Sequence, residues 1–174
     1  NTGYTHYRGQ FTDTDGDGYH EFDADDEFMA FAPNGAATLS LNWDDWEQLT
    51  QDFDMYILDE DGNEIASSTD SQSGPGSDAG EFVYYEFADE GPYYMAIYAA
   101  GADRAVTFDF FLRDGAIEYY TPGSSVNTPG DAYGALTVGA VHWQTGELAD
   151  YSSRGPTDDG RIKPDIVAPS GVSS

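Results

Sequence analysis

The chain has 174 residues, with 33 acidic and 6 basic side chains, no cysteine and a formal net charge of −27 at pH 7. A chain of this length buries a sizeable core and forms one domain or at most two. Nucleic acids and anionic membranes both require a cationic protein surface, so this charge argues against either partner. Without cysteine, disulfides and thiolate metal sites are excluded.

The acidic excess has two interpretations: local cation binding, or a solvated shell suited to concentrated salt, where screening weakens the repulsion between carboxylates. The chain has one lysine, Lys163, yet it is rich in aromatic residues, which argues against disorder. This combination resembles that of halophilic proteins. The chain begins at Asn1 rather than Met, with neither a leader nor an apolar run of membrane length. We therefore expect a processed or excised piece of a soluble protein.

Residues 1–21 are predicted to form a linker that carries an aspartate-rich loop. The stretch "DTDGDGYHEFDADDE" (13–27) alternates aspartates ahead of Gly18, as in the first half of an EF-hand calcium loop. Position 12 of that pattern is Ala24 rather than a bidentate glutamate, so another acidic residue would have to replace it. The predicted calcium ligands are the carbonyl of Tyr19 and the side chains of Asp13, Asp15, Asp17, Glu21 and Asp23. The alternative is that this Asp-Gly run is an ordinary solvated turn.

Short strands separated by turns are predicted for residues 22–118. The stretches "ATLSLNW" (37–43) and "AVTFDFFLR" (105–113) alternate apolar and polar residues, which places one face of each strand in a core. The stretches "FVYYEFA" (82–88) and "YYMAIYAA" (93–100) are rich in residues that favour strands. Turn residues separate the strands, and no window has a helical period. We therefore predict a mainly β fold with an antiparallel, jelly-roll-like β-sandwich.

The pattern changes in residues 119–174. The stretch "GALTVGAV" (134–141) is an uninterrupted run of small apolar residues, typical of a strand that is covered on both faces in a parallel sheet. We therefore expect this segment to be a partial α/β domain. Without partner strands, the same run would favour a homodimer of the isolated chain.

Three stretches of this segment follow one another in a distinctive order: "TPGDAYGALTVGAV" (128–141), "ADYSSRGP" (149–156) and "DGRIKPDIVAPSG" (159–171). Together they resemble the subtilisin-like serine peptidases (subtilases), in which they lie between the oxyanion-hole asparagine and the serine nucleophile. The resemblance implies a secreted serine endopeptidase that acts on proteins or peptides. Ser170 departs from the glycine that many relatives carry after Ala-Pro.

The resemblance also concerns Asn1, because subtilases place their oxyanion asparagine in an Ala-Gly-Asn turn. At the start of "NTG", Asn1 would donate its side-chain amide to the oxyanion, and the alternative is an ordinary loop residue. His6, His20 and His142 lie outside the histidine motif of the family, and no serine has a Gly-Thr-Ser-x-Ala context. We therefore expect structural or exposed histidines and an isolated chain that lacks the triad and is inactive.

Within residues 22–118, "DFDMYILDEDGNEIASS" (52–68) and "GPYYMAIYAAG" (91–101) resemble the pre-peptidase C-terminal domain, a small β-sandwich of secreted peptidases. The expected organisation is this sandwich (22–118) inserted into a partial subtilase catalytic domain (119–174). It would modulate substrate access or calcium-dependent stability. The alternative function is an extracellular β-sandwich module that binds carbohydrate or protein.

Overall fold

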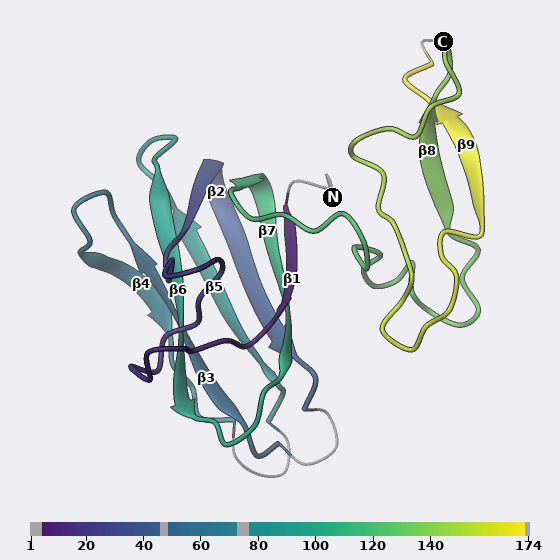
Figure 1. Ribbon diagram of the computed structural model, residues 1–174. Coiled ribbons are helices and arrows are strands. Elements are labelled where there is room, and N and C mark those ends of the chain that lie inside the picture. The colour runs from purple at the N-terminus through teal and green to yellow at the C-terminus, as the bar shows by residue number, and fades with distance from the viewer. Residues whose placement is uncertain (1–4, 46–48, 73–76, 173–174) are drawn as a thin grey trace. The chain divides into compact units, whose positions relative to one another are not determined.

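A computed structural model describes residues 5–45, 49–72 and 77–172 (Figure 1). The chain divides into two compact units, a larger one of Tyr7–Tyr119 and a smaller one that combines Asn1–His6 with Tyr120–Ser174. The larger unit thus includes residues 7–21 as well as the sandwich predicted for 22–118. Among the described residues there is no helix that is long and apolar enough to cross a membrane.

One hydrogen-bonded sheet of seven strands runs through the larger unit, in the order β1-β7-β2-β6-β3-β4 with β5 paired to β2. The described pairings of β2 with β5, β6 and β7, and of β3 with β4 and β6, are antiparallel. The strands are β1 (His6–Gln10), β2 (Met29–Trp43), β3 (Asp52–Leu58), β4 (Glu64–Ser68), β5 (Gly80–Glu86), β6 (Tyr93–Gly101) and β7 (Thr107–Ile117).

Strand β2 folds this sheet into two layers because its partner changes along its length. Its first residues, Met29–Phe31, pair with β6, whereas Ala36–Asn42 pair with β5. On its other edge β2 pairs with β7 through Phe31–Pro33 and Thr38–Trp43, with a register shift between Pro33 and Thr38. Figure 1 shows the resulting arrangement, in which β3, β4 and β6 pack over β1, β2, β5 and β7.

The core lies between the two layers. The alternation predicted for the two strand stretches is confirmed, since all eight inward side chains are at most 2% exposed: Ala37, Leu39, Leu41, Trp43, Val106, Phe108, Phe110 and Leu112. Strand β3 pairs with neither β2 nor β7, yet the ring of Phe53 lies 5.0 Å from that of Phe108 and 5.3 Å from that of Trp43. These contacts join the layers, and they confirm the mainly β sandwich.

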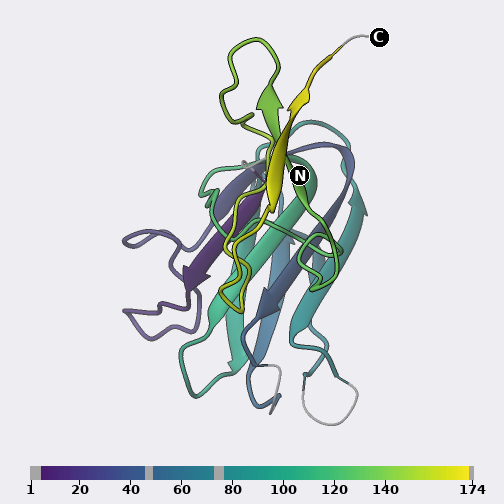
Figure 2. The same ribbon diagram turned by 90° about the vertical axis from the view of Figure 1, so that its right-hand side faces the viewer.

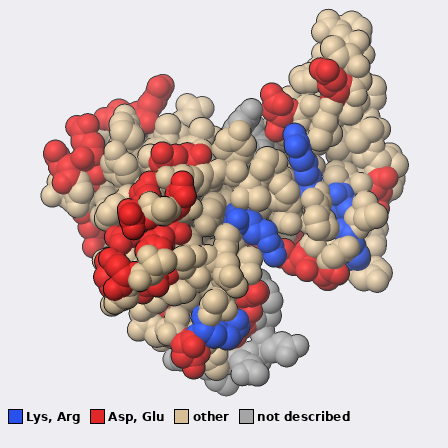
Figure 3. Space-filling model, in the orientation of Figure 1, with Lys and Arg blue, Asp and Glu red and all other residues tan. Residues whose placement is uncertain are grey.

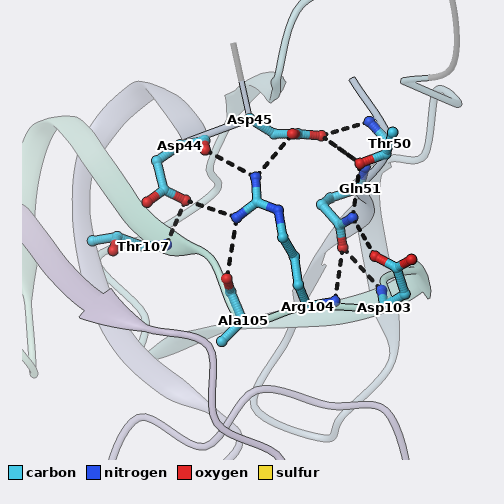
Figure 4. Close-up of polar contacts among 8 residues, drawn as sticks. All are labelled: Asp44, Asp45, Thr50, Gln51, Asp103, Arg104, Ala105 and Thr107. Atoms are coloured by element: carbon cyan, nitrogen blue, oxygen red, sulfur yellow. Dashed lines mark hydrogen bonds and ion pairs between the residues drawn. The ribbon is translucent and has the colours of Figure 1, made fainter. Parts of the chain in front are cut away.

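A polar network joins residues 44–45 and 50–51 to residues 103–107 of the sandwich (Figure 4). The buried carboxylate of Asp45 lies 2.8 Å from Arg104 and accepts the amides of Thr50 (2.6 Å) and Gln51 (2.8 Å). The side chain of Gln51 accepts the amides of Asp103 and Arg104 and donates to the Asp103 carboxylate. Burial favours the neutral form of Asp45, but hydrogen bonds from Gln51, Arg104 and Thr50 outweigh it and lower the pKa of this carboxyl.

The smaller unit contains a parallel pair of strands, β8 (Val138–His142) and β9 (Ile166–Ser170), which lie side by side in Figures 1 and 2. Parallel pairing agrees with the sequence-based expectation for the apolar run. Within the described residues, however, this run is not covered on both faces, because Leu136 is 71% and Val138 is 50% exposed. The expected α/β character is limited, in this part of the chain, to the two strands.

Candidate functional site

The chain enters and leaves the larger unit at two residues that are hydrogen-bonded to each other. The amide of Thr121 donates to the carbonyl of His6 (2.7 Å), and Nδ1 of the fully buried His6 lies 2.8 Å from the carbonyl of Thr121. Both residues belong to the smaller unit. Such a closed connection is what an inserted domain requires of its host.

The three motif stretches of the smaller unit pack directly on one another. The amide of Ala140 donates to Oγ of Ser152 (3.0 Å). A Cβ atom on Gly139 would lie 3.2 Å from that same oxygen and 3.3 Å from Pro164, so only glycine fits between the two other stretches without displacement. Gly155 lies even closer to its neighbour, since its added Cβ would meet the carbonyl oxygen of Lys163 at 2.2 Å. The close packing of the three stretches thus depends on glycine at positions 139 and 155 and on the hydroxyl of Ser152.

Lys163 is buried within this packing. Its ammonium donates to the carbonyl of Ala135 (2.6 Å) and to the carboxylate of Asp165 (2.7 Å). Asp165 also accepts the amide of Thr137 (2.8 Å). The hydrogen bonds from Lys163 and Thr137 lower the pKa of the Asp165 carboxyl, which is therefore a carboxylate at neutral pH. Sequence reasoning assigned no role to Lys163, although its being the only lysine was an available signal.

A cavity of about 230 Å³ opens among the same stretches. Its wall includes Val126, Asn127, Gly130, Gly139, Ser152 and Pro164. Gly130 and Thr137 of the first motif stretch both contribute to this wall. A concave site with both polar and apolar lining residues can hold a ligand.

The predicted calcium loop brings three of its six predicted ligands together. Oxygen atoms of Asp13, Asp15 and Asp17 lie within 4.8 Å of one another, a spacing compatible with calcium–oxygen distances of about 2.3–2.6 Å. The turn depends on glycines with positive φ: Gly16 and Gly18 both donate their amides to Asp13, at 2.7 and 3.0 Å. Hard oxygen donors in a tight turn fit calcium.

The other predicted ligands have hydrogen-bond partners among their near neighbours. The carboxylate of Glu21 accepts the amide (3.0 Å) and hydroxyl (2.5 Å) of Thr14, and Asp23 accepts the amide of Ala24 (2.8 Å). Tyr19 donates its amide to Asp17 (2.9 Å) and packs its ring against that of Tyr98.

Sequence reasoning missed Glu27, which lies beyond the twelve positions of an EF-hand loop. Burial raises the pKa of the Glu27 carboxyl, and the charges of Asp17, Asp15, Glu21 and Asp13 raise it further. This carboxyl is therefore close enough to the aspartate group to feel its field. Spacing along the chain contained no signal for it, because the fold brings Glu27 back towards the loop.

The histidines are structural or exposed, as expected. His20 is fully buried in the larger unit, where its Nδ1 accepts the amide of Thr12 (3.1 Å) and its Nε2 lies 2.9 Å from the hydroxyl of Tyr7. The amide at Nδ1 leaves the ring proton on Nε2, so the imidazole is neutral and donates to Tyr7. Burial lowers the pKa of His20 to about 4. His142 is exposed, and Asn1, the predicted oxyanion residue, lies outside the described residues.

Comparison with known proteins places this geometry in context. The Subtilase family model matches residues 30–173. An uncharacterized protein of Aquifex aeolicus, aq_aa18, is 43% identical over 53 residues, which are 25% of this chain and 24% of that protein. The fold is similar to the CspB protease of Clostridium perfringens, with a TM-score of 0.64 at 15% identity, over 96% of this chain and 38% of the protease.

A weaker structural match is the pre-peptidase C-terminal domain of a collagenase from Bacillus anthracis, with a TM-score of 0.41 at 15% identity, over 63% of this chain and 89% of that domain. The chain spans about a quarter of the length of the curated relative and 38% of the CspB protease. The family match extends over most of the chain and includes all three interlocking motifs. On this basis the chain belongs to the subtilase family.

Proposed function

We propose that this chain is part of a secreted subtilisin-like serine endopeptidase, in whose catalytic domain the larger unit is inserted. The observation that carries the proposal is the mutual packing of the three subtilase motifs through Gly139, Ser152 and Gly155. The reaction is acyl transfer: a serine attacks the peptide carbonyl, a histidine takes its proton, and hydrogen-bond donors stabilise the oxyanion. The triad residues come from outside these 174 residues, so the chain alone is inactive.

The larger unit modulates access of protein substrates to the site. Support comes from the connection at His6 and Thr121, which lies only a few residues before Val126 and Asn127 in the cavity wall. An insert held at this point is attached close to the segment that would contact substrate. Large folded substrates would be more sensitive to the insert than short peptides.

The test is deletion of residues 8–118 from the complete protease. We expect cleavage of a small chromogenic peptide to persist while the activity towards a folded protein changes, so the ratio of the two activities shifts. An unchanged ratio would contradict the modulating role. Absence of serine-dependent peptidase activity from the complete, undeleted protein would overturn the proposed function itself.

Calcium stabilises the larger unit in this proposal. The grouped oxygens of Asp13, Asp15 and Asp17 would hold the ion. These three carboxylates lie so close together that they gain from a shared divalent cation. Calcium would neutralise the charge of these carboxylates and restrict the motion of the loop.

We also propose that the folded protein is adapted to concentrated salt. Carboxylates crowd over the larger unit on the face shown in Figure 3, and the formal net charge is −27. Raising the ionic strength from about 0.1 M to about 1 M shortens the screening length from about 10 Å to about 3 Å. The unfolding midpoint should therefore rise with potassium chloride, and a constant or falling midpoint would contradict the proposal.

A second candidate function is a binding module for extracellular carbohydrate or protein. Phe82 and Tyr84 of β5 are 61% and 60% exposed, and they lie opposite Ser40 and Thr38 of β2. Exposed aromatic rings beside hydroxyl side chains suit stacking against a sugar or a peptide. The substitutions Phe82→Ala and Tyr84→Ala should then reduce retention on insoluble polysaccharide or protein without affecting small-peptide cleavage. Absence of retention by the wild-type protein would exclude this function.

A further inference from the structure

The only lysine of this acidic chain is one of its buried side chains. Lysine is among the residue types least often buried, because removing an ammonium from water is costly unless it is paired. The side chain of Lys163 is only 5% exposed, and its ammonium has two partners, the carbonyl of Ala135 at 2.6 Å and the carboxylate of Asp165 at 2.7 Å. A buried ammonium does not contribute to solubility, so its role lies in the contacts that it makes inside the protein.

The Lys163 ammonium contacts residues 130–137, a segment that forms part of the cavity wall. Ala135 lies within this segment. Asp165 holds Thr137 through two hydrogen bonds, since its carboxylate accepts the Thr137 amide (2.8 Å) and its own backbone amide donates to the Thr137 carbonyl (2.9 Å). The hydroxyl of Thr137 in turn donates to the carbonyl of Gly130. Hydrogen bonds thus run from Lys163 to both ends of residues 130–137, and both Gly130 and Thr137 line the cavity.

The backbone of Lys163 is itself held in place. Gly155 packs so tightly against it that an added Cβ would meet its carbonyl oxygen at 2.2 Å, and Pro164 follows at once. The ammonium therefore projects from a fixed origin, and its compact group with three donors can satisfy a carbonyl and a carboxylate together.

We propose that Lys163 is the positioning residue of the cavity, an internal cation that holds residues 130–137 in the conformation that binds substrate. This inference rests on the proposed peptidase function. It assigns to Lys163 control over substrate affinity rather than over the chemical step, since the residue contacts the wall and not the reacting atoms. Loss of the charge should loosen the wall and leave the carboxylate of Asp165 without its counter-charge.

The test compares Lys163→Met with Arg113→Met in the complete protease. Methionine matches the unbranched stem of lysine but lacks the ammonium group, whereas Arg113 is 79% exposed and pairs only weakly, at 3.6 Å, with the adjacent Asp114. Both variants gain the same net negative charge. We expect Lys163→Met to raise KM for a peptide substrate by about tenfold or more with kcat nearly unchanged, as for loss of binding alone. Arg113→Met should leave both constants unchanged.

A second readout is independent of activity. Hydrogen exchange of the amides of residues 135–137 should accelerate in Lys163→Met, and in the isosteric Asp165→Asn, while amides of the sandwich core keep their wild-type rates. If KM and the exchange rates of Lys163→Met both equal those of the wild type, the side chain only fills space and the inference is wrong. If the wild type lacks peptidase activity, the proposed function fails, and hydrogen exchange still decides whether Lys163 positions the segment.

Discussion

The carbonyl oxygen of Lys163 occupies the place that a Cβ atom on residue 155 would need, at a separation of only 2.2 Å from that position. The backbone nitrogen and carbon of Lys163 lie within 3.2 Å of the same point, so the neighbour cannot yield as a flexible side chain would. The glycine of "SSRGP" and the "KPD" segment are therefore one structural unit. Their joint presence in the sequence reflects contact in space.

Substitution of Gly155 by alanine should destabilise the smaller unit by about 3 kcal/mol or more, because the added methyl group meets backbone. Gly134→Ala is the matched control, since nothing lies within 4 Å of its added Cβ and its φ is not positive. The measurement is the thermal unfolding midpoint of the complete protease. Equal midpoints for the two variants would show that residue 155 and Lys163 are farther apart than described.

The substitution Arg104→Met should cost about 2–3 kcal/mol of unfolding free energy, because it leaves the carboxylate of buried Asp45 without a counter-charge. Removing one partner of a buried ion pair costs about 2–5 kcal/mol, and we expect the lower end of this range because Arg104 is itself 43% exposed. Urea unfolding at neutral pH measures the loss. Arg113→Met, which removes a cation with no buried partner among the described residues, is expected to fall within about 0.5 kcal/mol of wild type.

Acid should weaken the larger unit through His20. The pKa of this buried imidazole is lowered from 6.5 to about 4, so between these values the unfolded chain binds a proton that the folded protein does not. The contribution of His20 is complete above about pH 6.5 and declines as the pH falls to about 4, by about 3 kcal/mol in total. Unfolding of His20→Gln over this range should show a flatter pH dependence. Parallel pH profiles for variant and wild type would contradict the burial of a neutral ring.

Calcium should raise the unfolding midpoint of the complete protein, and Asp15→Asn should abolish most of that rise. At a free calcium concentration about 100 times Kd, the gain is about 2.7 kcal/mol. Asp61→Asn is the control, because Asp61 occupies another Asp-Gly turn but is not part of the described group of aspartates. A calcium response that survives Asp15→Asn, or that is lost in Asp61→Asn, would place the ion elsewhere.

Asn1 provides a test of the proposed chemistry. If it supplies an oxyanion donor, Asn1→Ala in the complete protease should lower kcat by about 10²–10³ with little effect on KM, a magnitude that comes from subtilisin itself. Steady-state kinetics with a small peptide substrate separate the two constants. A wild-type kcat in this variant would make Asn1 an ordinary loop residue.

The strands of the sandwich and the family motifs can be predicted from local patterns in the chain. Alternation in stretches such as 37–43 and 105–113 is a local property of the chain, and it correctly predicted which side chains face the core. The order of the three motifs was likewise sufficient to indicate a subtilase, and the family match bears this out.

Contacts between distant residues are set by the folded structure. It changes the partner of β2 from β6 to β5 along one strand, it brings Glu27 into the field of the aspartate loop, and it buries Lys163 between two motifs. These relationships depend on contacts between residues far apart in the chain, whose energies no local pattern encodes, because they arise only when packing sets the distances between charges and donors.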